Sequence, residues 1–162
     1  MGITEGVEEV KMDTKIIKKV FKYVLVILWM MIIYKFSSDT ADISNSKSSL
    51  VIEMLAFIGV DINSIFGELA MLVVRKLGHF TEYFILCVLL INSFYKDMTL
   101  RGNYKLSLLI SFLYACSDEF HQLFVPGRSG QIVDVFVDTL GALLGIFIWN
   151  IFIERKSKKG EA

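Results

Sequence analysis

The chain has 162 residues, 54% of them hydrophobic, and a mean hydropathy of +0.57. A soluble protein of this size has too much surface for its volume to hide so many apolar side chains, so the composition predicts a membrane protein. Its 17 basic and 17 acidic residues cancel, which gives no argument for a nucleic-acid partner. Cys87 and Cys116 both lie inside apolar runs and are interpreted as core residues.

The first membrane-spanning helix is predicted over residues 20–36. The polar stretch before it, residues 1–19, mixes both charge signs and is predicted to be a cytoplasmic tail. Lys22 and Lys35 interrupt the apolar run only near its ends, where lysines can reach the lipid headgroups. A secretory signal peptide is the alternative, but its apolar core would normally be shorter and be followed by a small-residue cleavage pattern. We therefore expect a retained helix.

The next segment connects the first two spans. Residues 37–49 are rich in Ser, Asp, Asn and Thr, which predicts a loop with many possible helix caps. Residues 50–74 are moderately apolar and are split at Gly59 and Asp61. This pattern predicts a short interfacial helix, followed by a second helix that runs into the next membrane segment.

Three further spans are predicted over residues 77–95, 106–125 and 132–153. A basic turn joins the first two of these, and a tight loop with Pro126, Gly127 and Gly130 joins the last two. About 20 helical residues match a hydrocarbon core of about 30 Å. The predicted fold is all-α: a polytopic membrane domain over residues 20–153, built as a bundle of four transmembrane helices with a short interfacial helical segment in the first outer loop.

The distribution of basic residues predicts the orientation. Most lysines and arginines, including those of the basic tail at residues 154–162, lie on the side of the two termini. Cytoplasmic segments carry such an excess, so both termini are predicted to be cytoplasmic.

Polar side chains gather at the predicted outer ends of the last three spans. Ionisable groups inside a span are costly and usually face the protein interior or a water-filled cavity. Helical spacing places Arg75, His79 and Glu82 on one face. It also aligns Asp134 and Asp138 with Gly141 and Gly145, two glycines that would allow close approach to the second or third span. Together these faces predict one outward-facing polar pocket.

The pocket residues fall into two predicted groups. Guanidinium groups suit phosphate, and the acids and histidines suit general acid–base chemistry. The candidate catalytic residues are His79, Glu82, Asp118, Glu119 and His121. The candidate substrate-binding residues are Arg75, Lys76, Tyr83, Gln122, Arg128, Asp134 and Asp138.

Each of these residues also has a structural interpretation. Arg75 and Lys76 suit headgroup phosphates, His79 and Glu82 suit a buried hydrogen-bonded pair, and Asp134 suits a cap or ion pair at a helix start. Arg128 would then only brace its loop. The concentration of so many charges at one depth favours a functional pocket over packing alone.

A divalent metal ion is a further alternative for the pocket. Two histidines and several acids could bind Zn²⁺ or Mn²⁺. However, the chain has no His-Glu-x-x-His motif, and the ligands would have to come from three helices. From sequence, no metal ligand is assigned and the cofactor stays open.

Three motifs carry a family resemblance. They are Arg75-Lys76-x-x-His79-Phe80-x-Glu82-Tyr83, Asp118-Glu119-Phe120-His121-Gln122-x-Phe124-x-Pro126-Gly127-Arg128-Ser129-Gly130 and Asp134-x-x-x-Asp138-Thr139-x-Gly141. With the Ser37-Ser38 turn, they resemble the VanZ-like family over most of residues 34–148. The sequence departs from many members, which carry Asn, at Asp138.

The resemblance implies a multi-pass protein of the bacterial cytoplasmic membrane. Some members of that family are linked to low-level resistance to teicoplanin-type glycopeptides, but no reaction is settled for the family. Three function classes therefore remain: an enzyme acting on a lipid-linked or cell-wall substrate, a non-catalytic protein that binds such a headgroup, and a transporter component. Four short spans without internal repeats make the transporter the least favoured. The expected partners are the bilayer and a lipid-linked or cell-wall polymer headgroup, and the oligomeric state stays open.

Overall fold

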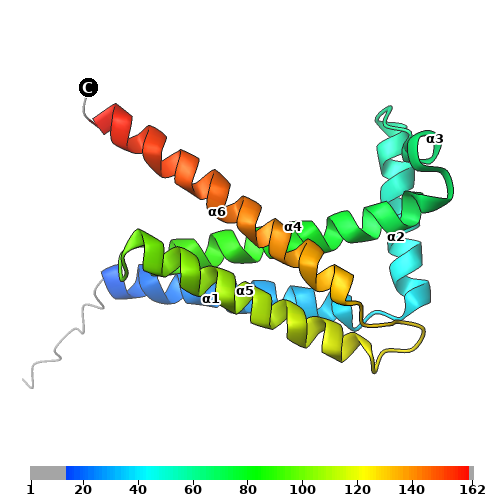
Figure 1. Cartoon of the computed structure of the whole chain (residues 1–162), viewed down its shortest axis with the longest axis horizontal. Helices are drawn as coiled ribbons and strands as arrows, with labels where there is room; N and C mark the ends of the chain where they lie inside the picture. The colour runs from blue at the N-terminus through cyan, green and yellow to red at the C-terminus, as the bar shows by residue number, and fades with distance from the viewer. Residues whose placement is uncertain (1–13, 161–162) are drawn as a thin grey trace, which may run out of the picture.

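The chain folds entirely into helices over the residues that can be described. A computed structural model describes residues 14–160, without the side chains of residues 156–159 (Figure 1). Helices α1 (Thr14–Ser37), α2 (Ala41–Phe57) and α3 (Ile62–Phe66) are followed by a 3-10 turn, η1 (Gly67–Leu69). Helices α4 (Ala70–Phe94), α5 (Leu100–Gln122) and α6 (Ile132–Gly160) complete the fold. The prediction of an all-helical protein is confirmed for this part of the chain.

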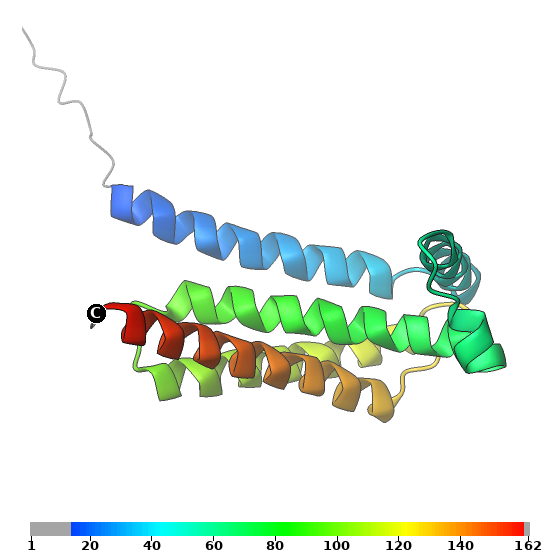
Figure 2. The same ribbon diagram turned by 90° about the horizontal axis from the view of Figure 1, so that it is seen from above.

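Four long helices run back and forth along one direction (Figures 1 and 2). The start of α1 and the end of α6 lie at one end, whereas α2, α3 and the connection between α5 and α6 lie at the other. Helix α4 occupies the centre, because it contacts α1, α2, α5 and α6. Within the described range, two segments are long and apolar enough to cross a membrane: Ile62–Phe94 and Ile132–Arg155.

Helix α2 corrects one prediction. Residues 37–49 were expected to form a loop, but the helix begins at Ala41 after the extended residue Thr40. The hydroxyls of Ser46 and Ser48 donate to the carbonyl oxygens of Asp42 and Ser44, one helical turn earlier. Serine usually competes with helix formation, but here its hydroxyl is satisfied inside the helix.

The predicted break after α2 is confirmed. Gly59 adopts a positive φ of 90°, which glycine tolerates because it has no Cβ. The Asp61 carboxylate then accepts a hydrogen bond of 3.1 Å from the Ser64 backbone N–H and caps α3. From there α3 and η1 lead directly into α4.

Helices α4 and α6 run parallel and make backbone contact. A Cβ at Gly141 would lie 2.2 Å from the Phe80 carbonyl oxygen, and one at Gly145 would lie 3.1 Å from that of Phe84. The two predicted close-approach glycines therefore face α4, the helix of the second predicted span. The same face of α6 carries Asp138 one turn and Asp134 two turns before Gly141, so both acids meet α4 as well.

Candidate functional site

A cavity of about 220 Å³ opens at the end of the bundle that carries α2. Its wall combines three cations, several acids and an apolar strip. The lining residues are Phe36, Ser37, Asp39, Ser44, Lys47, Ser48, Val51, Val74, Arg75, Gly78, His79, Glu82, Asp118 and Arg128. They come from α1, α2, the connection between them, α4, α5 and the loop before α6, so the cavity exists only in the assembled bundle.

The loop before α6 fixes Arg128 at this cavity. Val125, Pro126, Gly127 and Arg128 have the features of a type II turn: proline in second place, a glycine with φ of 74° in third place, and a 3.1 Å hydrogen bond from the Arg128 N–H to the Val125 carbonyl. The Ala41 N–H donates to the Pro126 carbonyl oxygen at 3.3 Å, which ties the turn to the start of α2.

The Arg128 side chain is half-buried and positively charged. Its Nη1 donates to the Ser44 hydroxyl at 2.7 Å. Burial lowers the pKa of the Arg128 guanidinium, and the neighbouring Arg75 guanidinium lowers it further. An arginine nevertheless keeps its proton in proteins, so two cations that repel each other face one cavity. An anion bound between them would relieve that repulsion.

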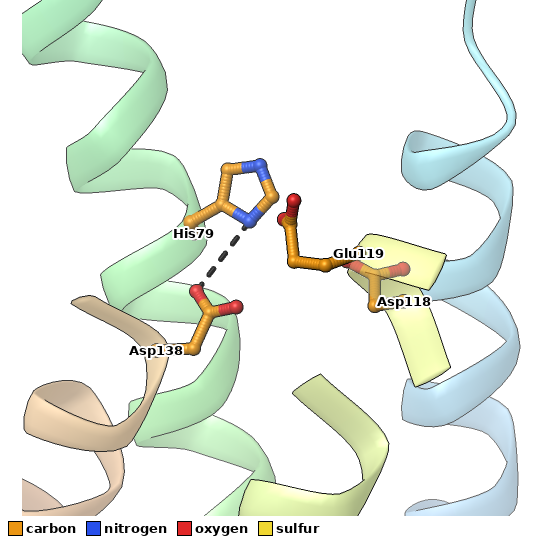
Figure 3. Close-up of side chains that lie close together, drawn as sticks. All are labelled: His79, Asp118, Glu119 and Asp138. Carbon is orange, nitrogen blue, oxygen red and sulfur yellow. Dashed lines mark ion pairs between the residues drawn. The ribbon is translucent and has the colours of Figure 1, made fainter. Parts of the chain in front are cut away.

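Four buried side chains cluster at the inner side of the cavity (Figure 3). They are His79 from α4, Asp118 and Glu119 from α5, and Asp138 from α6. The His79 Nδ1 lies 3.4 Å from the Asp138 Oδ1, and Asp138 is fully buried.

Two hydrogen bonds orient carboxylates of this cluster. The Gln131 backbone N–H donates to the Glu119 Oε2 at 2.7 Å, and the Gln122 amide donates to the Asp118 Oδ2 at 3.4 Å. The other groups of the cluster are less satisfied: His79 Nδ1, Glu119 Oε1 and both Asp138 oxygens have no hydrogen-bond partner among the described residues.

A smaller cavity lies beside the first and shares Arg75, His79 and Arg128 with it. Gln122 and Asp134 also line it. The Lys76 ammonium forms an ion pair with the buried Asp134 carboxylate, so α4 and α6 are joined by opposite charges near their starts.

The structure brings most of the predicted residues together; Lys76 is linked to the smaller cavity only through its ion pair with Asp134, and His121 and Tyr83 lie apart. His121 turns towards α1: its Nε2 lies 3.2 Å from the Ser38 hydroxyl, and its ring centroid lies 4.8 Å from that of Tyr34. Tyr83 is fully buried in the apolar core and lines neither cavity. The two histidines therefore do not share one pocket, and His79 faces Asp138 rather than pairing with Glu82.

The lining residues that were not identified from the sequence include Ser37, Ser44 and Lys47. Lys47 is ion-paired with Asp39, and both face the cavity. Two of the three belong to α2, which was expected to be loop at this point, so no helical face could be assigned to them. The spacing of Ser44 and Ser48, four residues apart with Lys47 between them, would have predicted one face of a helix.

The family model described as VanZ/LLP1 matches residues 22–153, which include every residue of both cavities. Neither the curated proteins nor the solved structures contain a match to the chain.

Proposed function

This chain belongs to the VanZ/LLP1 family, and we propose that it is a multi-pass protein of the bacterial cytoplasmic membrane that binds the phosphate-bearing headgroup of a lipid-linked cell-envelope component. Through that binding it would contribute to resistance to teicoplanin-type glycopeptides. The headgroup would enter the 220 Å³ cavity from the outer face of the membrane.

The proposed membrane domain covers residues 20–153, with α1, α4, α5 and α6 as its four spans. Large apolar side chains are exposed along the outside of the bundle, such as Phe21 on α1 and Phe136 and Phe147 on α6. A soluble protein rarely exposes a continuous apolar surface of this kind, whereas lipid covers it in a membrane. The excess of basic residues near both ends supports cytoplasmic tails at residues 1–19 and 154–162.

One observation carries the headgroup proposal: Lys47, Arg75 and Arg128 face the same cavity as an apolar strip. Arginine forks bind phosphate oxygens through two parallel hydrogen bonds. The strip of Phe36, Val51 and Val74 offers a surface for the first carbons of a lipid chain. A ligand with an anionic head and an apolar tail fits both parts of this wall.

A second candidate function is cleavage of a phosphate ester of the same lipid. Glu82 and Asp118 line the cavity together with the two arginines, so acid–base groups lie beside the position proposed for the phosphate. Positioned carboxylates can transfer a proton to or from a reacting oxygen.

Replacing Arg128 by methionine is predicted to weaken headgroup binding by about 10-fold or more, since a hydrogen bond to a charged group contributes about 1.5–3 kcal/mol. The measurement is binding of fluorescent phosphatidic acid to the purified full chain in nanodiscs of neutral lipid. Arg128→Lys should bind with intermediate affinity, because lysine keeps the positive charge but cannot form the two parallel hydrogen bonds of a guanidinium. Arg101→Met is the matched control, because Arg101 is exposed at the start of α5, and Figure 1 shows that α5 starts at the end of the bundle opposite α2. Equal affinity of Arg128→Met and wild type would refute the proposal.

Susceptibility to a teicoplanin-type glycopeptide separates binding from cleavage. In a sensitive host with matched membrane levels, wild type should protect and Arg128→Met should not. If binding is sufficient, Glu82→Gln and Asp118→Asn should still protect; if cleavage is required, both should fail. His121→Ala should protect in either case, because His121 lines neither cavity.

A further inference from the structure

We propose that His79, Asp118, Glu119 and Asp138 form the binding site of one divalent transition-metal ion, of the Zn²⁺ or Mn²⁺ class. The site lies between α4, α5 and α6, at the inner side of the cavity. The inference does not depend on the headgroup proposed above, and it assigns to these side chains a role that their sequence spacing does not reveal.

The geometry of the four side chains matches that of a metal site. One donor atom from each residue lies within 4.8 Å of the others. Ligands at about 2.0–2.2 Å from a metal lie at most about 4.4 Å apart, so only small side-chain rotations are needed. The 3.4 Å between His79 Nδ1 and Asp138 Oδ1 already matches the edge of a tetrahedron with bonds of about 2.1 Å.

Three of the four residues have donor atoms without a hydrogen-bond partner in the described part of the chain, and the one ion-pair contact among these atoms is the 3.4 Å between His79 Nδ1 and Asp138 Oδ1. His79, Glu119 and Asp138 are all more than nine-tenths buried. His79 Nδ1, Glu119 Oε1 and both Asp138 oxygens have no hydrogen-bond partner within residues 14–160, and Figure 3 shows the His79 ring and the Asp138 carboxylate facing each other beside that of Glu119. Unpartnered buried polar atoms cost stability, and metal coordination satisfies several of them at once.

The surrounding hydrogen bonds support the same assignment. Metal-binding carboxylates are usually held by a hydrogen bond to their second oxygen, which orients the first. Glu119 has this arrangement, because the Gln131 backbone N–H binds Oε2 and leaves Oε1 free. Asp118 is oriented in the same way by the Gln122 amide.

Charge balance also favours a divalent cation. Three carboxylates lie close together in a buried position, where uncompensated charge is costly. Lys76 on α4 already pairs with Asp134, and Arg128, the cation near Asp118 and Glu119, donates to the Ser44 hydroxyl rather than to either carboxylate. A protonated His79 would supply one positive charge, whereas a divalent ion supplies two and leaves the imidazole neutral for coordination. A mixed set of imidazole and carboxylates suits Zn²⁺ or Mn²⁺ better than Mg²⁺ or Ca²⁺, which prefer oxygen ligands alone.

The test is metal binding by the purified full chain in detergent. After removal of bound metal by EDTA, incubation with Zn²⁺ or Mn²⁺ and removal of the excess, elemental analysis should find about one ion per wild-type chain. Removing a group that hydrogen-bonds a metal ligand lowers metal affinity by about 10–100-fold, and removing the ligand itself should lower it further. His79→Gln and Asp138→Asn should therefore weaken metal affinity by more than about 100-fold. His121→Gln is the matched control and should bind as wild type does, because His121 faces α1.

A second measurement separates loss of the site from loss of the fold. The added metal should raise the melting temperature of wild type and of His121→Gln, but not that of a folded His79→Gln or Glu119→Gln variant. Absence of bound Zn²⁺ and Mn²⁺ in wild type would overturn the proposal. Metal binding by His79→Gln with wild-type affinity would overturn it too. Either result would leave the phosphatidic acid experiment unaffected, since that experiment tests the arginines.

Discussion

Gly141→Ala is expected to disrupt the bundle more than any other single methyl addition on α6. The new Cβ would lie 2.2 Å from the Phe80 carbonyl oxygen and 3.2 Å from the Phe84 nitrogen, both of them backbone atoms of α4. No side-chain rotation can relieve this overlap, so the two helices must move apart. Overpacking lowers the free energy of unfolding by about 1–3 kcal/mol, whereas the higher helix propensity of alanine raises it by about 1 kcal/mol.

Two other glycines provide matched controls. At Gly145 the nearest atom would be the Phe84 carbonyl oxygen at 3.1 Å, and around Gly78 there is open space within 4 Å. Thermal unfolding of the purified variants should therefore rank Gly78→Ala at or above wild type, Gly145→Ala below it and Gly141→Ala lowest. If Gly141→Ala melts at the wild-type temperature, the backbone contact between α4 and α6 is not present in the folded protein.

Lys76→Met is expected to lower the free energy of unfolding by about 3–5 kcal/mol, because it leaves the buried Asp134 carboxylate without its partner. Asp134→Leu should lower the free energy of unfolding by less, since the Lys76 side chain is 22% exposed and can extend outwards from the bundle. The double variant Lys76→Met/Asp134→Leu should recover most of the loss, because a buried ion pair can be replaced by apolar contacts.

Denaturant unfolding of the four proteins forms a double-mutant cycle that measures the coupling. An additive cycle, in which the double variant loses the sum of both single losses, would show that the ion pair contributes nothing. The same variants should leave phosphatidic acid binding near the wild-type level if they fold, because neither residue lines the larger cavity.

The long helices could be predicted from the sequence because length and apolar content are local properties. Residues 20–36, 77–95, 106–125 and 132–153 each lie within or almost within one observed helix. Residues 37–49 were assigned wrongly because Ser, Asp and Asn favour both caps and loops, and the sequence does not show that the Ser46 and Ser48 hydroxyls bond back inside a helix.

The site could be predicted only as far as single helix faces allow. Asp118 and His121 are three residues apart, which leaves them about 60° apart around the helix. That difference is enough for Asp118 to face the cavity while His121 contacts Tyr34 on α1 and Ser38 just after it. The grouping of His79 with Glu119 and Asp138 joins three helices, so no spacing along the chain encodes it.

The parallel packing of α6 on α4 sets the order in which the protein can become functional. Asp138 is carried by the last helix, and Glu119 receives its hydrogen bond from Gln131, just before that helix begins. A ribosome that has made only α1 to α5 has therefore produced two of the three helices that carry the four clustered side chains, but not α6 with Asp138. During synthesis the acids of α5 therefore lack their α6 neighbours until the last helix is made and packs, so misfolding is expected most at the stage between the third and fourth long helices.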